Sequence, residues 1–249
     1  MSLPPGQPRR RLRVEGLVNA RDLGGLRRRD GALTPTGVFY RSENVDAVTP
    51  AGWDQLYEVG VRTIVDLRRS DERALDATPR PSWVNTEVVD LHGFENVVFW
   101  RDYWDSGAVN TALYYEAHLA TMPERAVAAL SAIVAAPPGG VLFHCVHGRD
   151  RTGMIALLLL AAADVEPEQI VEDYLETVRL GVVRAAWSYR NNDEPALEAL
   201  CASLGSSTEG AFRAALGAHN LPRVLSAVPM NPPQREALMT WRGSLTRAD

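Results

Sequence analysis

The spacing of apolar positions along the chain predicts strands that alternate with helices. Apolar, β-branched runs predict buried strands over residues 61–66, 84–91 and 141–143. Apolar residues at helical spacing predict helices over residues 49–60, 111–136 and 167–178, the second interrupted at Pro123. The first strand has the continuous apolar character that suits a parallel sheet, and the alternation indicates a doubly wound α/β layer.

The C-terminal part of the chain has a different pattern. Residues 182–249 are Ala-rich and helical in spacing, and Cys201 falls on the apolar side, which predicts a core residue. The segment over residues 1–13 is rich in Pro and Arg and is expected to be a flexible tail. We therefore predict a single domain over residues 14–249, in which residues 182–249 form a helical appendage or a lid.

The composition is that of a folded globular protein. The 249 residues are 46% hydrophobic and 23% charged, and the net charge of -5 leaves no basic footprint for nucleic acid. No apolar stretch is long enough to predict stable insertion into a membrane. The two Cys residues exclude a disulfide framework.

The richest stretch for chemistry is a short polar loop between the strand at residues 141–143 and an apolar helical run. It reads His-Cys-Val-His-Gly-Arg-Asp-Arg-Thr-Gly and begins at His144. Amide groups that converge on a helix N-terminus bind anions, because the N–H groups and the positive end of the helix dipole point the same way. Such surroundings favour the reactive thiolate of Cys145, and the planar guanidinium of Arg151 can hold two oxygens of a tetrahedral oxyanion.

The loop resembles the phosphate loop of cysteine-dependent phosphatases, with the pattern H-C-(x5)-R-[ST]. Its narrower pattern, H-C-x-x-G-[KR]-D-R-T-G, is similar to that of the bacterial tyrosine-phosphatase-like family, which includes the mycobacterial protein tyrosine phosphatase B group. Softer matches are N-x-R-D-L-G-G from Asn19, Y-R-S from Tyr40 and the pair Asp173-Tyr174. The resemblance covers roughly residues 19–216. It implies a cysteine-phosphatase-like α/β fold, a parallel-rich central sheet flanked by helices, with an extra C-terminal helical segment.

The resemblance also implies a reaction. Phosphate monoesters would be hydrolysed through a phosphocysteine, with protein phosphotyrosine as the first expectation and dual or phosphoinositide specificity as extensions. Cys145 is the expected nucleophile, Arg151 stabilises the transition state, and Asp150 is the first candidate for general acid and base. His144 is expected to order the loop. The substrate phosphate is expected to bind Val146, His147, Gly148, Arg149 and Thr152.

The remaining expectations concern cofactors, location and specificity. No cofactor and no metal is required, phosphate is the product, and the oligomeric state is not encoded in any visible pattern. A reduced thiolate favours the cytoplasm, and secretion without a classical signal peptide stays open. The family usually carries Lys at the position of Arg149 and a small residue at that of His147, so the substrate preference stays open as well.

Several other residues have two interpretations. Asp66 ends a strand at the edge where ligands gather in parallel sheets, or it forms an ion pair with an Arg. Asp102 lies in an aromatic stretch over residues 92–107, which either lines the site as a lid or packs between strand and helix. Arg41 either reaches the substrate or pairs with an acid, and His92 is expected to be a surface or capping residue.

Two other classes of function compete with the phosphatase. A sulfurtransferase or arsenate reductase also uses a Cys on an anion-binding loop, and a non-catalytic module can bind phosphate. The five residues between Cys145 and Arg151, together with the loop Asp, argue against a sulfurtransferase. The lack of further positioned Cys argues against most arsenate reductases. The intact set of Cys145, Asp150 and Arg151 argues against a binding module.

Overall fold

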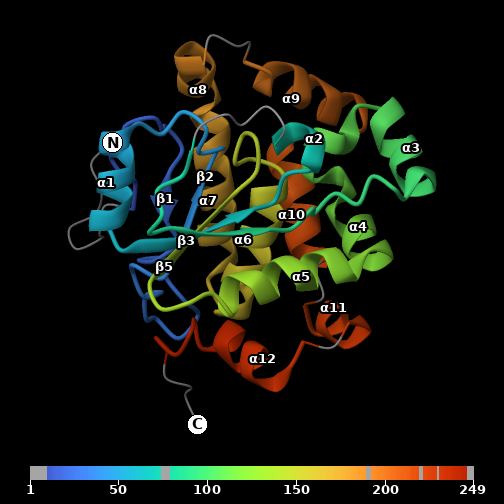
Figure 1. Ribbon diagram of the computed structural model, residues 1–249. Helices are drawn as coiled ribbons and strands as arrows, with labels where there is room; N and C mark the ends of the chain where they lie inside the picture. The colour runs from blue at the N-terminus through green and yellow to red at the C-terminus, as the bar shows by residue number, and fades with distance from the viewer. Residues whose placement is uncertain (1–9, 74–78, 189–191, 219–220, 229, 246–249) are drawn as a thin grey trace.

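Five strands form one mostly parallel sheet in the computed structural model, which describes residues 10–73, 79–188, 192–218, 221–228 and 230–245 (Figure 1). The strands are β1 (Arg21–Asp22), β2 (Phe39–Ser42), β3 (Val61–Asp66), β4 (Asn85–Val88) and β5 (Gly140–His144). Their spatial order is β1-β2-β5-β3-β4, in which β1 is antiparallel to β2 and the other neighbours are parallel. The central position of β5 places its carboxyl end between the ends of β2 and β3, where ligands bind in α/β sheets.

Helices cover both faces of this sheet. In chain order they are α1 (Pro50–Glu58), α2 (Ser70–Arg73), α3 (Val97–Asp105), η1 (Ala108–Asn110), η2 (Ala112–Tyr114), α4 (Tyr115–Thr121), α5 (Pro123–Val134), α6 (Arg151–Ala162), α7 (Pro167–Arg179), α8 (Gly181–Ser188), α9 (Glu194–Ser203), α10 (Thr208–Ala218), α11 (Leu221–Ala227) and α12 (Pro232–Met239). In Figure 1, α1 lies at one side of the sheet and α5, α6 and α10 lie at the other.

Alternate residues of the central strands face two separate hydrophobic clusters, as the two-residue period of a strand requires. The cluster on the side of α1 includes Tyr40, Ile64 and Leu142. The larger cluster, on the side of α5 and α6, includes Phe39, Val65 and Phe143. Within α6, 11 of the 12 residues are buried, so this helix is apolar on every side and anchors the loop that precedes it.

The predicted elements differ from the structure mainly at their ends. The strand predicted over residues 61–66 is confirmed as β3. The strand predicted over residues 84–91 is shorter and exposed, because β4 lies at the edge of the sheet with β3 as its neighbour. The helix predicted over residues 111–136 is divided into η2, α4 and α5, and the break falls just before Pro123.

The C-terminal helices belong to the main core. Cys201 of α9, Phe212 of α10 and Leu225 of α11 are buried in the same hydrophobic cluster as α6. At the other end, residues 1–9 of the predicted tail lie outside the described residues. Arg10 is anchored, contrary to the expectation of a tail through residue 13, because its guanidinium reaches the buried Asp173. Among the helices that the structure describes, none is long and apolar enough to cross a membrane.

Candidate active site

The loop between β5 and α6 is held so that its amide groups converge. The carbonyl groups of residues 146–148 accept hydrogen bonds from outside the loop. The donors are the backbone of Asn44 at 3.0 Å, the side chain of Asn19 at 3.3 Å and Nη2 of Arg41 at 2.6 Å. In a planar trans peptide the C=O and the following N–H point in opposite directions, so the N–H groups of residues 147–149 face the interior of the loop. This arrangement is an anion nest at the N-terminus of α6.

One glycine in the loop is required by close backbone contact. Gly148 has a φ of +66°, and a Cβ atom at this position would lie 2.3 Å from the carbonyl oxygen of Ser42. No side chain fits there without displacing the end of β2. The loop and β2 can therefore approach each other only with glycine at position 148.

The candidate nucleophile lies at the start of the nest. Cys145 is buried, and Nδ1 of His144 lies 3.0 Å from the Cys145 carbonyl oxygen, which agrees with a role of His144 in ordering the loop. Burial lowers the pKa of His144 to about 4, so this imidazole is neutral at ordinary pH. Among the described residues, the buried hydroxyl of Thr152 has no hydrogen-bond partner.

Arg151 is fixed at the first turn of α6 by a carboxylate that the sequence did not identify. Its Nη1 and Nη2 donate to the two carboxylate oxygens of Glu72, at 2.6 and 2.7 Å. A fork-to-fork pair of this kind sets the plane of the guanidinium. The Nε atom is buried and has no partner among the described protein groups, so it is a donor that a bound oxyanion can use.

Asp150 is a buried acid with an unusual environment. The Tyr114 hydroxyl donates to both carboxylate oxygens at 2.8 Å, and the Tyr115 hydroxyl donates to the Asp150 backbone carbonyl at 2.6 Å. Burial raises the pKa of Asp150 to about 7, against the opposing Tyr114 hydrogen bond and the charges of Arg151 and Arg149. The group can therefore both give and take a proton near neutral pH.

The other two acids considered from the sequence are placed differently. Asp66 is buried and pairs with Arg68 at 2.8 Å and Arg80 at 3.3 Å. Although burial alone would raise its pKa, the Arg68 hydrogen bonds lower the pKa of Asp66 to about 2, so it is an ion-pair partner rather than an acid. Asp102 has a side chain that is 76% exposed and contacts Arg101 on the surface of α3.

The remaining loop residues divide between the surface and the protein interior. Val146 is half-buried and His147 is exposed. Arg149 is buried, and its Nε donates to both carboxylate oxygens of Glu194 in α9, at 3.0 and 2.8 Å. Its Nη1 donates to the Asn110 carbonyl at 2.6 Å. The charge of Arg149 is therefore already partnered by the C-terminal helices.

A buried charge cluster supports the loop from the side of β1 and β2. Asp173 in α7 accepts from Nε of Arg21 at 2.9 Å and from Nη1 of Arg41 at 2.6 Å. Burial would raise the pKa of Asp173, but the charges of Arg21, Arg41 and Arg10 hold it well below its usual range. Because Arg41 also donates to Gly148, it is a support of the loop and pairs with an acid, one of the two roles predicted for it.

Two surrounding features bear on ligands. Among the described residues, no group of three or more His, Cys, Asp or Glu side chains is arranged to hold a metal ion.

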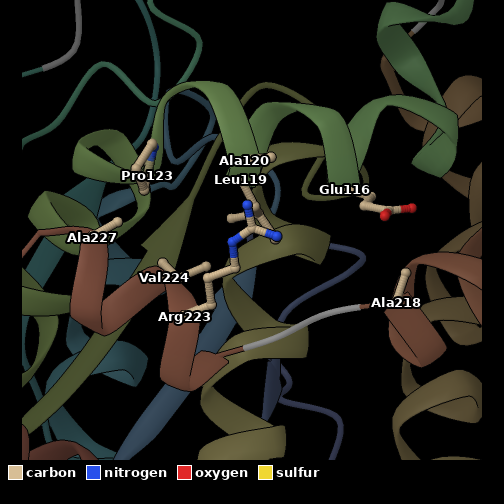
Figure 2. Close-up of a pocket in the computed structure, with 8 residues that line it drawn as sticks. All are labelled: Glu116, Leu119, Ala120, Pro123, Ala218, Arg223, Val224 and Ala227. Carbon is tan, nitrogen blue, oxygen red and sulfur yellow. The ribbon is translucent and has the colours of Figure 1, made fainter.

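A surface pocket between α4, α5, α10 and α11 is shown in Figure 2 and does not include the phosphate loop. It is lined by Glu116, Leu119, Ala120, Pro123, Ala218, Arg223, Val224 and Ala227.

The fold and the loop together define the class of the protein. A parallel-rich sheet whose central strand ends in a Cys-(x5)-Arg anion nest, followed by a buried helix, is the arrangement of the cysteine-dependent phosphatases. The particular family follows from comparison with known proteins: a model of the tyrosine phosphatase family matches residues 12–221. This chain belongs to the tyrosine phosphatase family.

Three proteins whose names include tyrosine phosphatase or protein phosphatase are similar in sequence to this chain. A protein of Cupriavidus necator with the provisional name of tyrosine-protein phosphatase is 34% identical over 69% of this chain and 64% of its own length. A tyrosine-protein phosphatase of Nostoc commune is 32% identical over 56% of this chain and 48% of its own. The triple specificity protein phosphatase PtpB of Mycobacterium tuberculosis is 29% identical over 59% of this chain and 62% of its own. The chain thus spans less than two thirds of each relative.

Three residues near Asp150 and Arg151 were missed or misjudged from the sequence. The prediction that His92 is a surface or capping residue is wrong, because it is 3% exposed and its Nε2 lies 3.6 Å from Asp150. The sequence places Tyr114 only within the helix predicted over residues 111–136 and assigns no role to Glu72. Only the position of Glu72, soon after the carboxyl end of β3, was a signal that it lies at the ligand edge of the sheet.

Proposed function

We propose that this protein hydrolyses phosphate monoesters through a phosphocysteine intermediate, with protein phosphotyrosine as its principal substrate. The observation that carries the proposal is the convergence of Cys145, Arg151 and a buried Asp150 on one anion nest. The resemblance of the loop to those of cysteine-dependent phosphatases supports it, as does the family to which the chain belongs.

The first chemical step transfers the phosphoryl group to sulfur. The Cys145 thiolate attacks phosphorus in line, a new S–P bond forms and the P–O bond to the leaving group breaks. The nest amides and Arg151 stabilise the charge on the phosphoryl oxygens. Asp150 donates its proton to the leaving oxygen and becomes a carboxylate, whose charge the Tyr114 hydroxyl stabilises by hydrogen bonding.

The second step regenerates the enzyme. The Asp150 carboxylate accepts a proton from a water molecule, and the oxygen of that water attacks phosphorus. The S–P bond breaks, Cys145 leaves as the thiolate, and inorganic phosphate is the product. A pKa of about 7 for Asp150 suits both steps, because the same group is protonated in the first and deprotonated in the second.

The surroundings of the loop favour phosphotyrosine over phosphoinositides. An aromatic group beside Asp150 includes Phe94, which stacks on His92 with 4.6 Å between ring centroids, and the half-exposed Trp104, 5.2 Å from Phe94. Such a wall suits an aryl ester. Of the two basic loop residues that would suit a polyanionic headgroup, Arg149 is paired with Glu194 and His147 is exposed. Dual specificity remains part of the proposal, since one relative carries the name triple specificity phosphatase.

Two finer proposals concern the C-terminal helices and the location. We propose that α9 acts as a cover of the site, because Glu194 joins it directly to the phosphate loop through Arg149.

We also propose that the protein works in a reducing compartment such as the cytoplasm, because the mechanism needs Cys145 as a free thiolate.

Phosphate release from a matched panel tests the function. The panel contains phosphotyrosine, phosphoserine and phosphothreonine peptides and short-chain phosphoinositides, each with wild type and Cys145→Ser. We expect release to be fastest from the phosphotyrosine peptide and to fall to the enzyme-free blank in Cys145→Ser, because a neutral hydroxyl is a poor nucleophile without an activating base. Release from no member by a folded wild type would favour the phosphate-binding module or the sulfurtransferase.

The role of Asp150 predicts a dependence on the leaving group. In Asp150→Asn, kcat/KM for an alkyl phosphate is expected to fall by about 10²- to 10³-fold, while that for an activated aryl phosphate falls far less. In wild type, kcat/KM for the alkyl ester should decline as the pH rises through about 7, because Asp150 loses the proton that it donates. The variant should lack this decline.

Asp102→Asn is the matched control, since it removes a carboxylate on the exposed surface of α3. It should retain both the wild-type rates and the pH profile. Equal losses for both kinds of substrate in Asp150→Asn would make Asp150 a structural residue.

A further inference from the structure

The buried imidazole of His92 is an unassigned group next to the candidate acid. Its Nε2 lies 3.6 Å from a carboxylate oxygen of Asp150, slightly beyond hydrogen-bond length. Neither ring nitrogen has a hydrogen-bond partner among the described residues, although the side chain is almost completely buried. A buried polar group without a partner costs free energy, so its retention beside Asp150 calls for a reason.

The backbone and ring of His92 are fixed from several directions. The Asp90 side chain accepts a hydrogen bond from the His92 amide at 3.0 Å, and Nε1 of Trp100 donates to the His92 carbonyl at 2.9 Å. The ring stacks on Phe94 at an interplanar angle of 6° and meets the edge of Trp100 at 5.0 Å. These contacts hold the imidazole with its Nε2 toward Asp150.

We propose that His92 is a positioning residue whose Nε2–H donates to the Asp150 carboxylate left behind when the leaving oxygen takes its proton. The inference rests on the proposed phosphatase function, in which Asp150 is the general acid. Hydrogen bonds of this kind are often long before substrate binds, and a small rotation of either side chain closes the remaining gap. Together with Tyr114, His92 supplies donors on the protein side of a charge that forms away from water.

The charged and titratable groups around the pair agree with a neutral imidazole. Burial lowers the pKa of His92 well below its usual value, and the charges of Arg151, Arg69 and His118 act in the same direction. Asp150 is faced by Tyr114 and Tyr115 and by Arg151 and Arg149 of its own loop. A neutral imidazole carries one N–H, and placing it on Nε2 gives that nitrogen a partner in the Asp150 carboxylate.

Three substitutions separate hydrogen bonding from packing. The amide nitrogen of His92→Gln can occupy the place of Nε2, that of His92→Asn reaches only the place of Nδ1, and His92→Phe keeps the stacking without a donor. We expect His92→Asn and His92→Phe to lower kcat/KM for an alkyl phosphate by about tenfold or more and that for an activated aryl phosphate by about twofold at most. Loss of the donor should also move the decline of activity to higher pH, because the carboxylate is less stabilised.

The conservative variant and a matched histidine make the test decisive. His92→Gln should retain most of the wild-type rate and pH profile. His118→Gln replaces a second buried histidine, whose Nε2 lies 3.3 Å from the His92 carbonyl oxygen, and should leave the pH profile unchanged. Equal losses for both substrates, or a pH profile unchanged in His92→Asn, would overturn the inference. So would an equal shift of the profile in His118→Gln.

A measurement without turnover separates this inference from the proposed function. The infrared C=O stretch of protonated Asp150, identified by subtraction of Asp150→Asn, reports the midpoint of its titration. We expect this midpoint to rise in His92→Asn and to stay near the wild-type value in His92→Gln. If wild type released no phosphate, the proposed function would fail, and an unchanged midpoint in His92→Asn would separately exclude the contact between His92 and Asp150.

Discussion

Replacing Arg151 by lysine is expected to lower kcat by about 10³-fold or more on every phosphate ester that the protein hydrolyses. Lysine keeps the positive charge but has no planar fork, so it can satisfy neither the two oxygens of Glu72 nor two oxygens of the phosphoryl group at once. The loss should be equal for alkyl and activated aryl phosphates, because in the proposed mechanism Arg151 stabilises the phosphoryl oxygens and not the leaving group. Steady-state kcat on both kinds of ester measures it.

The matched control is Arg179→Lys, which changes an Arg–Glu pair that also has two hydrogen bonds but lies on the surface of α7. We expect its kcat to equal that of wild type within error. A loss in Arg151→Lys confined to substrates with poor leaving groups would contradict the role proposed for Arg151.

Replacing Asp173 by asparagine is expected to lower the free energy of unfolding by about 3–5 kcal/mol, because it leaves buried guanidinium groups without their counter-charge. Arg21 and Arg41 are each 1% exposed or less and both depend on this carboxylate. Urea unfolding of the variant and wild type under identical conditions measures the difference. Activity should fall as well, since Arg41 also holds the Gly148 carbonyl of the phosphate loop.

Glu172→Gln is the control for Asp173→Asn, because it removes the adjacent carboxylate, which forms an exposed ion pair with Arg179. Such a pair contributes less than about 1 kcal/mol.

The pH dependence of the stability that Asp173 provides has a defined sign. The pKa of Asp173 is lowered by folding, so its contribution is present above the pKa of the unfolded chain and is lost as the pH falls through the folded value. Equal stabilities of Asp173→Asn and Glu172→Gln would show that the cluster is dispensable.

The motif could name only those candidate site residues that are close together in sequence. Cys145, Asp150 and Arg151 lie within one short loop, and the apolar pattern on either side was sufficient to identify a strand before it and a helix after it. The motif that begins at Asn19 did not identify Asp173 as the partner of Arg21, because the two residues lie 152 positions apart.

The supporting residues were not predictable because they are distant in sequence. Glu72 lies 79 positions from Arg151, and Tyr114 lies 36 positions from Asp150. An aromatic residue with helical spacing is equally typical of ordinary core packing, so the pattern carried no information about the Tyr114 hydroxyl. His92 is predicted at the surface because the sequence alone does not show whether a single histidine in a loop is buried.

The sequence by itself determined the strand–loop–helix unit, the candidate reactive residues on it and the family, because these depend on neighbouring residues and on backbone propensity. The tertiary structure decided which side chains surround each reactive group. These surrounding side chains set the proton affinity of Asp150 and the plane of the Arg151 guanidinium, and they include Glu194, which neutralises Arg149. The physical reason is that burial and charge proximity depend on distances in space, and the folding of the sheet and helices alone establishes those distances.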